Sequence, residues 1–187
     1  MGRTRSHVAR WANRLPTPSV EDSVKGVEPM HVSASEGKSF WLTTDRHTFK
    51  LTGADTNGAL TLIEVTARPE FGPPPHIHHR QDECFYILEG AFEFTADGRT
   101  FTAGAGSVVH LARGRVHTHR AAGTAPARAL ALYTPAGVER FIEEAGTPVA
   151  DSSVVPAPPA LADLERIVAI AGKHGIEVPP PSAAQPR

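Results

Sequence analysis

The sequence predicts an all-β fold, a barrel or sandwich of short strands, followed by short C-terminal helices. Short apolar runs follow one another from residue 39 to residue 133, with no helical pattern between them. Turn signals such as Thr56-Asn57-Gly58 and Asp97-Gly98 separate these runs. Many short, evenly spaced strands without intervening helices are typical of sandwiches and barrels, and closing a barrel also removes unpaired strand edges.

The strands are expected at residues 39–43, 48–52, 59–67, around His76, 84–88, 91–95, 99–102, 107–111, 116–120 and 127–133. Glu89-Gly90 ends the strand at 84–88, and Arg113-Gly114 forms a tight turn before the strand at 116–120. Alternation along the strands predicts which side chains fill the barrel. The expected interior residues are Phe85 and Ile87, with Phe92 or Phe94 and Phe101.

The end of the chain changes from strand to helix. Residues 137–145 form a short amphipathic segment, and a second one follows the proline-rich stretch at 155–159. Its apolar stripe consists of Leu161, Leu164, Ile167, Val168 and Ala171. Such a stripe is expected to pack against the barrel or against a partner subunit. The basic Lys173-His174 and the following Gly175 predict the end of this helix.

Length and composition are consistent with one domain with tails. The 187 residues are 40% hydrophobic, which is enough for one core. We expect an extended, poorly ordered leader at 1–35, a barrel at 36–136, a helical extension at 137–178 and a disordered tail at 179–187. The net charge of −1 argues against a nucleic-acid partner.

The arginines of the N-terminal segment could belong to a nucleic-acid arm or a transit peptide, but their spacing favours a disordered leader. The chain has no apolar run of the roughly 18 residues that would span a bilayer. We therefore expect a soluble, cytoplasmic protein without a membrane partner. Cys84 is the single cysteine, which suits a reducing compartment, and we expect it to be a buried structural thiol.

Two histidines and a glutamate lie close together after Pro73-Pro74-Pro75. His76 and His78 are two residues apart in an extended stretch, so both imidazoles should point the same way. A short polar turn at 79–82 then lets Glu83 fold back beside them. Imidazole and carboxylate groups arranged in this way are typical ligands of a transition metal ion.

His117 is the expected fourth ligand, because the tight turn at Arg113-Gly114 delivers it to the start of a returning strand. A strand histidine is more often a packing or surface residue than a ligand, and this chain has 10 histidines. His79 is out of phase with the ligands and is expected to face solvent or to lie behind them. His119 is in phase with His117 and is expected to contact substrate, to carry a proton or to form part of a cavity wall.

The spacings Gly72-x3-His76-x-His78-x4-Glu83-x6-Gly90 and Gly106-x7-Gly114-x2-His117 together resemble the two signature motifs of the cupin superfamily. The resemblance implies a cupin-type jelly-roll β-barrel with one divalent metal ion held by His76, His78, Glu83 and His117. The ion would be iron, nickel, manganese, cobalt or zinc. The segments 135–141 and 171–178 are also similar to the tail that follows the barrel in small quercetin 2,3-dioxygenase-like single-domain cupins. Cupins are commonly dimers, so the resemblance to the superfamily also implies a homodimer.

Three imidazoles and one carboxylate leave two open positions on an octahedral ion. The resemblance then implies a mononuclear dioxygenase that acts on a small phenolic, flavonol-like or enolisable substrate together with dioxygen. Glu83 would be both ligand and catalytic base. One alternative is a metal-dependent cyclase or isomerase, like a polyketide cyclase, in which His119 is the catalytic proton carrier. Another is a cupin that binds a small ligand without catalysis.

Overall fold

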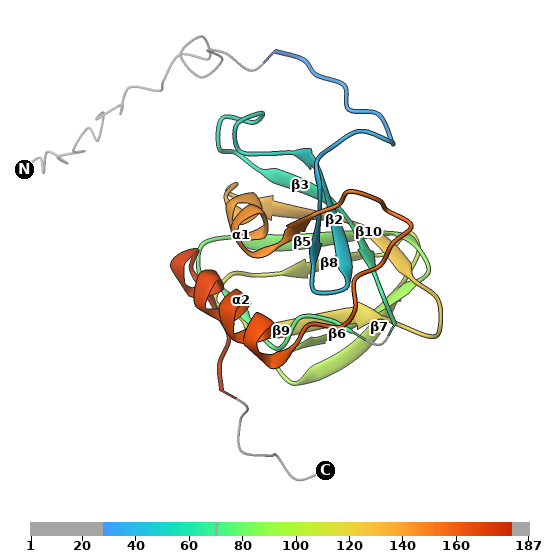
Figure 1. Ribbon diagram of the computed structural model, residues 1–187, viewed down its shortest axis with the longest axis vertical. Helices are drawn as coiled ribbons and strands as arrows, with labels where there is room; N and C mark the ends of the chain where they lie inside the picture. Colours follow the sequence, from blue (N-terminus) through green and yellow to red (C-terminus); the bar gives the residue numbers. More distant parts are fainter. Residues whose placement is uncertain (1–27, 70, 181–187) are drawn as a thin grey trace, which may run out of the picture.

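The computed structural model describes residues 28–69 and 71–180, which form two facing antiparallel β-sheets with two helices on one side (Figure 1). The larger sheet has the order β11-β1-β2-β3-β10-β5-β8, and the smaller has the order β7-β6-β9. A short ladder joins β12 to β4. The strands are β1 Ser39–Leu42, β2 Asp45–Leu51, β3 Thr61–Ala67, β4 Ile77–His78, β5 Asp82–Glu89, β6 Ala91–Ala96, β7 Arg99–Gly104, β8 Val108–Leu111, β9 His117–Ala121, β10 Ala127–Thr134, β11 Thr147–Pro148 and β12 Ile176–Glu177. The helices are α1 Val138–Ala145 and α2 Leu161–Lys173.

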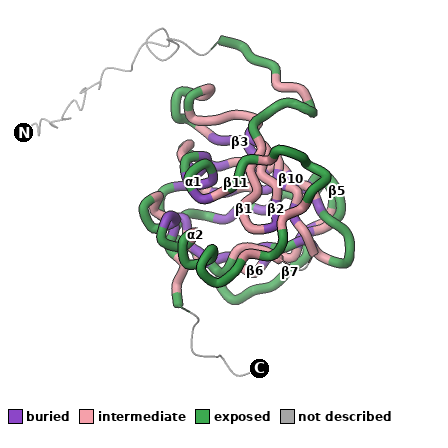
Figure 2. Tube along the Cα trace, in the orientation of Figure 1, coloured by how far each residue is buried: buried purple, intermediate pink, exposed green. Residues whose placement is uncertain are grey.

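The predicted all-β architecture with short C-terminal helices is confirmed. The strands expected between residues 39 and 133 are present, with ends that differ by a few residues from the predicted ones. Alternation along β3 and β10 is regular, with buried and half-buried residues in turn, because each strand presents one face to the facing sheet. Figure 2 shows the buried residues gathered between the layers.

Aromatic side chains from both sheets form the centre of the core. Phe85 and Ile87 on β5 and Phe92 and Phe94 on β6 are fully buried, as expected. The Phe85 and Phe94 rings meet edge to face with centroids 5.2 Å apart. The prediction for Phe101 is wrong, because 42% of this residue is exposed. It lies on β7, an edge strand of the smaller sheet, and its ring stacks on Phe94 from outside.

The predicted packing face of α2 is only partly buried. Ala171 and the neighbouring Ile170 are buried, whereas 72% of Leu161 is exposed. Leu164 and Val168 are also exposed. The C-terminal end of the helix therefore packs on the molecule, and its N-terminal half borders open space. Neither described helix is long and apolar enough to cross a membrane.

The predicted leader at 1–35 and tail at 179–187 fall mainly outside the described residues. These two domain limits stay predictions, as do the homodimer and the cytoplasmic location.

Glu139 joins α1 to the larger sheet. Its buried carboxylate accepts hydrogen bonds from the Thr61 hydroxyl, from the Gly53 amide at 3.0 Å and from the Gly137 amide at 2.8 Å. Burial by itself raises the pKa of Glu139, but these hydrogen bonds outweigh it and lower the pKa. Glu139 thus holds the start of α1 close to β3 and to the loop before it.

Replacement of Glu139 by alanine should reduce the free energy of unfolding by about 2 kcal/mol, because one buried and two partly buried donors lose their acceptor. Chemical denaturation would measure the change, with Glu143→Ala on the exposed side of α1 as control. The lowered pKa means that the contribution of Glu139 is present above the ordinary carboxyl pKa of 4.5 and is lost as the pH falls below it. Equal stability of the two variants near neutral pH would contradict this role.

Candidate metal centre

The four predicted ligands come from three strand segments that meet at one end of the barrel. His76 forms an antiparallel bridge with His117, in which each backbone amide donates to the other residue's carbonyl at 2.9 Å. His78 ends β4, and its carbonyl accepts a hydrogen bond from the Gly114 amide at 2.8 Å. Gly114 has a φ of +76°, which suits glycine and makes the tight turn before His117 possible.

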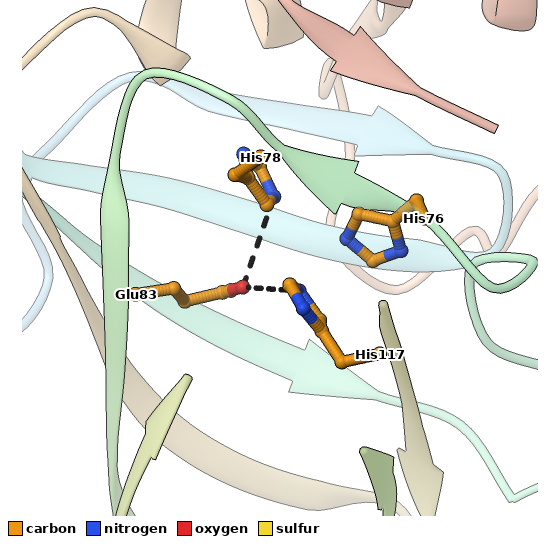
Figure 3. Close-up of side chains that lie close together, drawn as sticks. All are labelled: His76, His78, Glu83 and His117. Atoms are coloured by element: carbon orange, nitrogen blue, oxygen red, sulfur yellow. Dashed lines mark hydrogen bonds and ion pairs between the residues drawn. The ribbon is translucent and has the colours of Figure 1, made fainter. Parts of the chain in front are cut away.

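The structure brings His76, His78, Glu83 and His117 together. All four are buried, and one potential ligand atom from each lies within 4.8 Å of the others. In Figure 3 the rings of His78 and His117 face the Glu83 carboxylate, and His76 lies beside them. Local alternation brings His76 and His78 to the same side, as predicted, and the pairing of distant strands adds the other two side chains.

Backbone carbonyls orient two of the imidazoles. Nδ1 of His76 lies 2.9 Å from the Pro74 carbonyl, and Nδ1 of His117 lies 3.0 Å from the Arg115 carbonyl. A carbonyl only accepts, so each Nδ1 carries the proton, and Nε2 of a neutral ring is free to bind a cation. Nδ1 of His78 is buried and has no hydrogen-bond partner among the described residues.

The Glu83 carboxylate is held from both sheets. Tyr133 on β10 donates its hydroxyl proton to Oε1 of Glu83 at 2.6 Å. Oε2 lies 3.1 Å from Nε2 of His117 and 3.7 Å from Nε2 of His78. The sequence prediction did not include Tyr133. Alternation along the strand indicates only that Tyr133 points inward. Its contact with Glu83 depends on the register of β10 against β5, which the sequence alone does not show.

Burial and the neighbouring charges decide the protonation states. Burial lowers the pKa of His76 to about 3, and it also lowers the pKa of His78. Burial by itself raises the pKa of Glu83, but the hydrogen bond from His117 and the nearby histidines outweigh it and lower the pKa. Burial opposes protonation of His117, yet its hydrogen bond to Glu83 raises the pKa of His117.

These residues fit a divalent transition metal ion. Once His117 releases the proton that it shares with Glu83, an ionised carboxylate and three neutral imidazoles offer one oxygen and three nitrogen donors, a set that suits iron, nickel, manganese, cobalt or zinc. Orientation of the rings by Pro74 and Arg115, and of the carboxylate by Tyr133, is the arrangement that positions metal ligands. The group could therefore hold one ion whose identity the donor set leaves open.

A cavity of about 770 Å³ lies beside this group and borders three of the four candidate ligands. Most of its wall is apolar and comes from the loop at 71–74 and from α1 and α2, so the exposed half of α2 borders the cavity. None of the described residues that line it is a lysine or an arginine. The sequence analysis did not foresee this lining, because it depends on the packing of the C-terminal extension across the barrel.

His119 lies in the cavity wall, against the rings of Phe85, Phe92 and Phe94. Its Nδ1 is buried without a hydrogen-bond partner among the described residues, and burial lowers its pKa to about 4. Position 72 is occupied by glycine because the loop passes close to the β9 backbone there. A Cβ there would lie 2.1 Å from the His119 carbonyl oxygen.

Asp45 and His47, on β2, also line the cavity and were not predicted as site residues. Both project inward because β2 alternates in phase with the buried Phe49. Among the other predicted residues, His79 is exposed and pairs with Glu177 at 2.7 Å, as expected for a solvent-facing side chain. The prediction of a buried Cys84 is wrong, because this residue is half-buried on the opposite face of β5 from Glu83.

Comparison with known proteins agrees with this geometry. Residues 63–133 match the family model for the cupin domain, and this stretch includes all four candidate ligands. This part of the chain therefore matches a cupin domain, and the two antiparallel sheets agree with the jelly-roll fold that the sequence predicted. The quercetin 2,3-dioxygenase-like subtype stays a prediction.

Two plant proteins are similar to part of the chain. Germin-like protein 1-1 of Oryza sativa subsp. japonica is 35% identical over 85 residues, which cover 41% of this chain and 39% of the relative. Germin-like protein subfamily 2 member 2 of Arabidopsis thaliana is 35% identical over 95 residues, which cover 44% of this chain and 43% of the relative. The chain thus spans about two fifths of the length of these relatives.

Solved structures support the fold. KdgF from Halomonas sp. has a TM-score of 0.54 at 17% identity and covers 60% of this chain and 99% of its own. A predicted oxalate decarboxylase from Thermotoga maritima has a TM-score of 0.52 at 23% identity, with 57% of this chain and 99% of its own covered. The polyketide cyclase RemF from Streptomyces resistomycificus has a TM-score of 0.52 at 22% identity, with 57% and 80% covered. At these identities the likeness is one of fold.

Purified protein should contain close to one metal ion per chain, and His78→Ala should lose most of it, because the variant removes a buried donor. Elemental analysis by plasma mass spectrometry would measure the metal. His79→Ala is the matched control, since it removes the neighbouring exposed imidazole. Metal content that is unchanged in His78→Ala, or reduced equally in both variants, would argue against this centre.

Proposed function

We propose that the protein is a mononuclear metal-dependent dioxygenase that acts on a small phenolic, flavonol-like or enolisable molecule. One observation carries the proposal. Three imidazoles and one carboxylate, all buried, converge beside a large and mainly apolar cavity. A closed structural site would not need such a cavity, whereas a catalytic site keeps room for substrate next to the ion.

The charge of the cavity wall supports a neutral, apolar substrate. A sugar acid or a phosphorylated sugar would find no lysine or arginine among the described lining residues. The acidic residues of the cavity wall are Glu83 and Glu165, together with Asp45 when it is ionised, and they disfavour additional anionic charge. An aromatic molecule with adjacent hydroxyl and carbonyl oxygens would suit both the apolar wall and an ion at the four ligands.

A metal ion at this centre would supply Lewis-acid activation of a substrate oxygen and, if redox-active, electron exchange with dioxygen. The protein's own residues prepare the proton transfer. Tyr133 holds Oε1 of Glu83, so Oε2 is the carboxylate oxygen available to a substrate hydroxyl. The lowered pKa makes Glu83 a weak base, which suits an acidic enol or phenol better than an alcohol.

A metal-dependent cyclase or isomerase is the second candidate, and His119 is the observation that favours it. This residue lines the same cavity, and its lowered pKa leaves the imidazole unprotonated near neutral pH. A neutral imidazole in a substrate cavity can accept a proton at one carbon and return it at another. The resemblance to RemF is consistent with this candidate but reaches only to the fold.

Oxygen dependence separates the two functions. Metal-loaded protein incubated with quercetin should form product in air and none under anaerobic conditions, with His78→Ala inactive in both. Chromatography with mass detection would measure substrate loss and oxygen incorporation. Equal turnover without oxygen would contradict the dioxygenase. Quercetin that binds but is recovered unchanged in air would argue for a binding protein.

If the cyclase or isomerase is correct, His119→Gln should slow anaerobic turnover about 100-fold or more, since a positioned proton carrier contributes at least that much. Bound metal should remain near the wild-type level, because His119 is not among the four grouped ligands. His110→Gln, which changes an exposed histidine on β8, is the matched control. An undiminished rate in His119→Gln would exclude His119 as the proton carrier.

A further inference from the structure

Asp45 and His47 form a second polar group in the cavity, which we call the distal pair. They lie on β2 and face inward, whereas the four candidate metal ligands come from β4, β5, β9 and the segment before β4. Asp45 is 3% exposed, and the burial of a carboxyl group is unfavourable unless its hydrogen bonds are satisfied. The position of the pair in a mainly apolar wall therefore needs an explanation.

Strand register places the distal pair away from the metal group. Glu83 pairs with Tyr133, and four residues further along β5, Ile87 pairs with Ala129. Ala129 pairs with Val65, which in turn pairs with His47. At about 3.3 Å per residue, this offset of four residues places the backbone of His47 roughly 13 Å from the backbone of Glu83 along the strand direction. The cavity of about 770 Å³ that both groups line has room for a ligand of more than one ring.

The distal pair has unused hydrogen-bonding capacity toward the cavity. Nδ1 of His47 lies 3.3 Å from the Asp45 carbonyl and so carries the proton, which leaves Nε2 as an acceptor. Oδ1 of Asp45 accepts a hydrogen bond from the Arg68 amide at 3.1 Å. Among the described residues, neither Nε2 of His47 nor Oδ2 of Asp45 has a hydrogen-bond partner.

The charge state of the pair suits a hydroxyl group. Burial lowers the pKa of His47 to about 4, so the imidazole is neutral and accepts at Nε2. Burial raises the pKa of Asp45 to about 7, so the carboxyl group is largely protonated in mildly acidic solution and can donate. A hydroxyl group can donate to the one and accept from the other, whereas a carboxylate or phosphate cannot donate to Nε2.

We propose that Asp45 and His47 bind a hydroxyl group at the far end of the substrate, so that the cavity selects elongated hydroxylated aromatic molecules of at least two rings. The chelating oxygens of the same molecule would lie at the metal group. This inference rests on the proposed function, because it assumes an aromatic substrate anchored at the four ligands. It assigns a specificity role to two residues that lie outside the metal centre.

Two probes that differ by one hydroxyl group test the inference. 3-Hydroxyflavone has the chelating oxygens only, and its 4′-hydroxylated analogue adds a hydroxyl at the opposite end. Dissociation constants would be measured by fluorescence titration of metal-loaded protein under anaerobic conditions, so that no turnover occurs. The wild type should bind the analogue about five- to tenfold more tightly, the value of one net hydrogen bond.

The preference should fall to about one in His47→Leu, which keeps the volume but removes the acceptor, and should decrease in Asp45→Ala, which removes the donor. His110→Leu, on the outer face of β8, should keep the wild-type preference. Elemental analysis should show unchanged bound metal in all three variants, and circular dichroism should show that they are folded. Asp45→Ala, which removes the carboxyl group without adding volume, decides the question if His47→Leu does not fold.

The outcomes separate this inference from the function on which it rests. Wild-type protein that binds both probes equally would overturn the role of the distal pair and leave the aromatic substrate class in place. A preference that persists in the folded variants would do the same. Metal-loaded wild type that binds neither probe would overturn the proposed substrate class and, with it, the distal site.

Discussion

The buried Glu83 carboxylate is the interaction around which the site is organised. An ionised carboxylate away from water is unfavourable unless donors or cations surround it. Here Tyr133 from the larger sheet donates to one oxygen, and His117 from the smaller sheet lies next to the other. The two sheets and the β4 segment must therefore keep their relative positions for Glu83 to stay satisfied. Because His78 and His117 both face the same Glu83 oxygen, these positions also keep the two imidazoles close together.

The C-terminal extension adds a wall to the partly open cavity beside the candidate metal centre. α1 is held against the larger sheet by the Glu139 hydrogen bonds, and α2 packs on it through contacts near its C-terminal end. Both helices contribute apolar side chains to the cavity wall. A cupin domain alone would leave the centre more exposed to water, which would weaken electrostatic interactions there. The extension thus belongs to the functional site.

The cavity combines two kinds of polar chemistry within a mainly apolar wall. The candidate metal group could take a chelating pair of oxygens, and Asp45 and His47 on β2 line the same cavity and offer further hydrogen-bonding atoms. Among the described lining residues no lysine or arginine is available to pair with an anionic ligand. Fold neighbours as different as a polyketide cyclase and a predicted oxalate decarboxylase show that the barrel does not decide the chemistry.

Local spacing in the sequence by itself determined the strands, the inward phase of His76, His78 and Phe85, and the C-terminal helices, because periods of two and 3.6 residues act within one element. The combined spacing of both motifs also identified the four residues that the structure brings together. Only the tertiary structure decided that Tyr133 meets Glu83, that Asp45 and His47 share their cavity, and that Phe101 remains outside. These outcomes depend on strand register, edge position and helix docking, which join residues far apart in the chain and leave no periodic signal within any single segment.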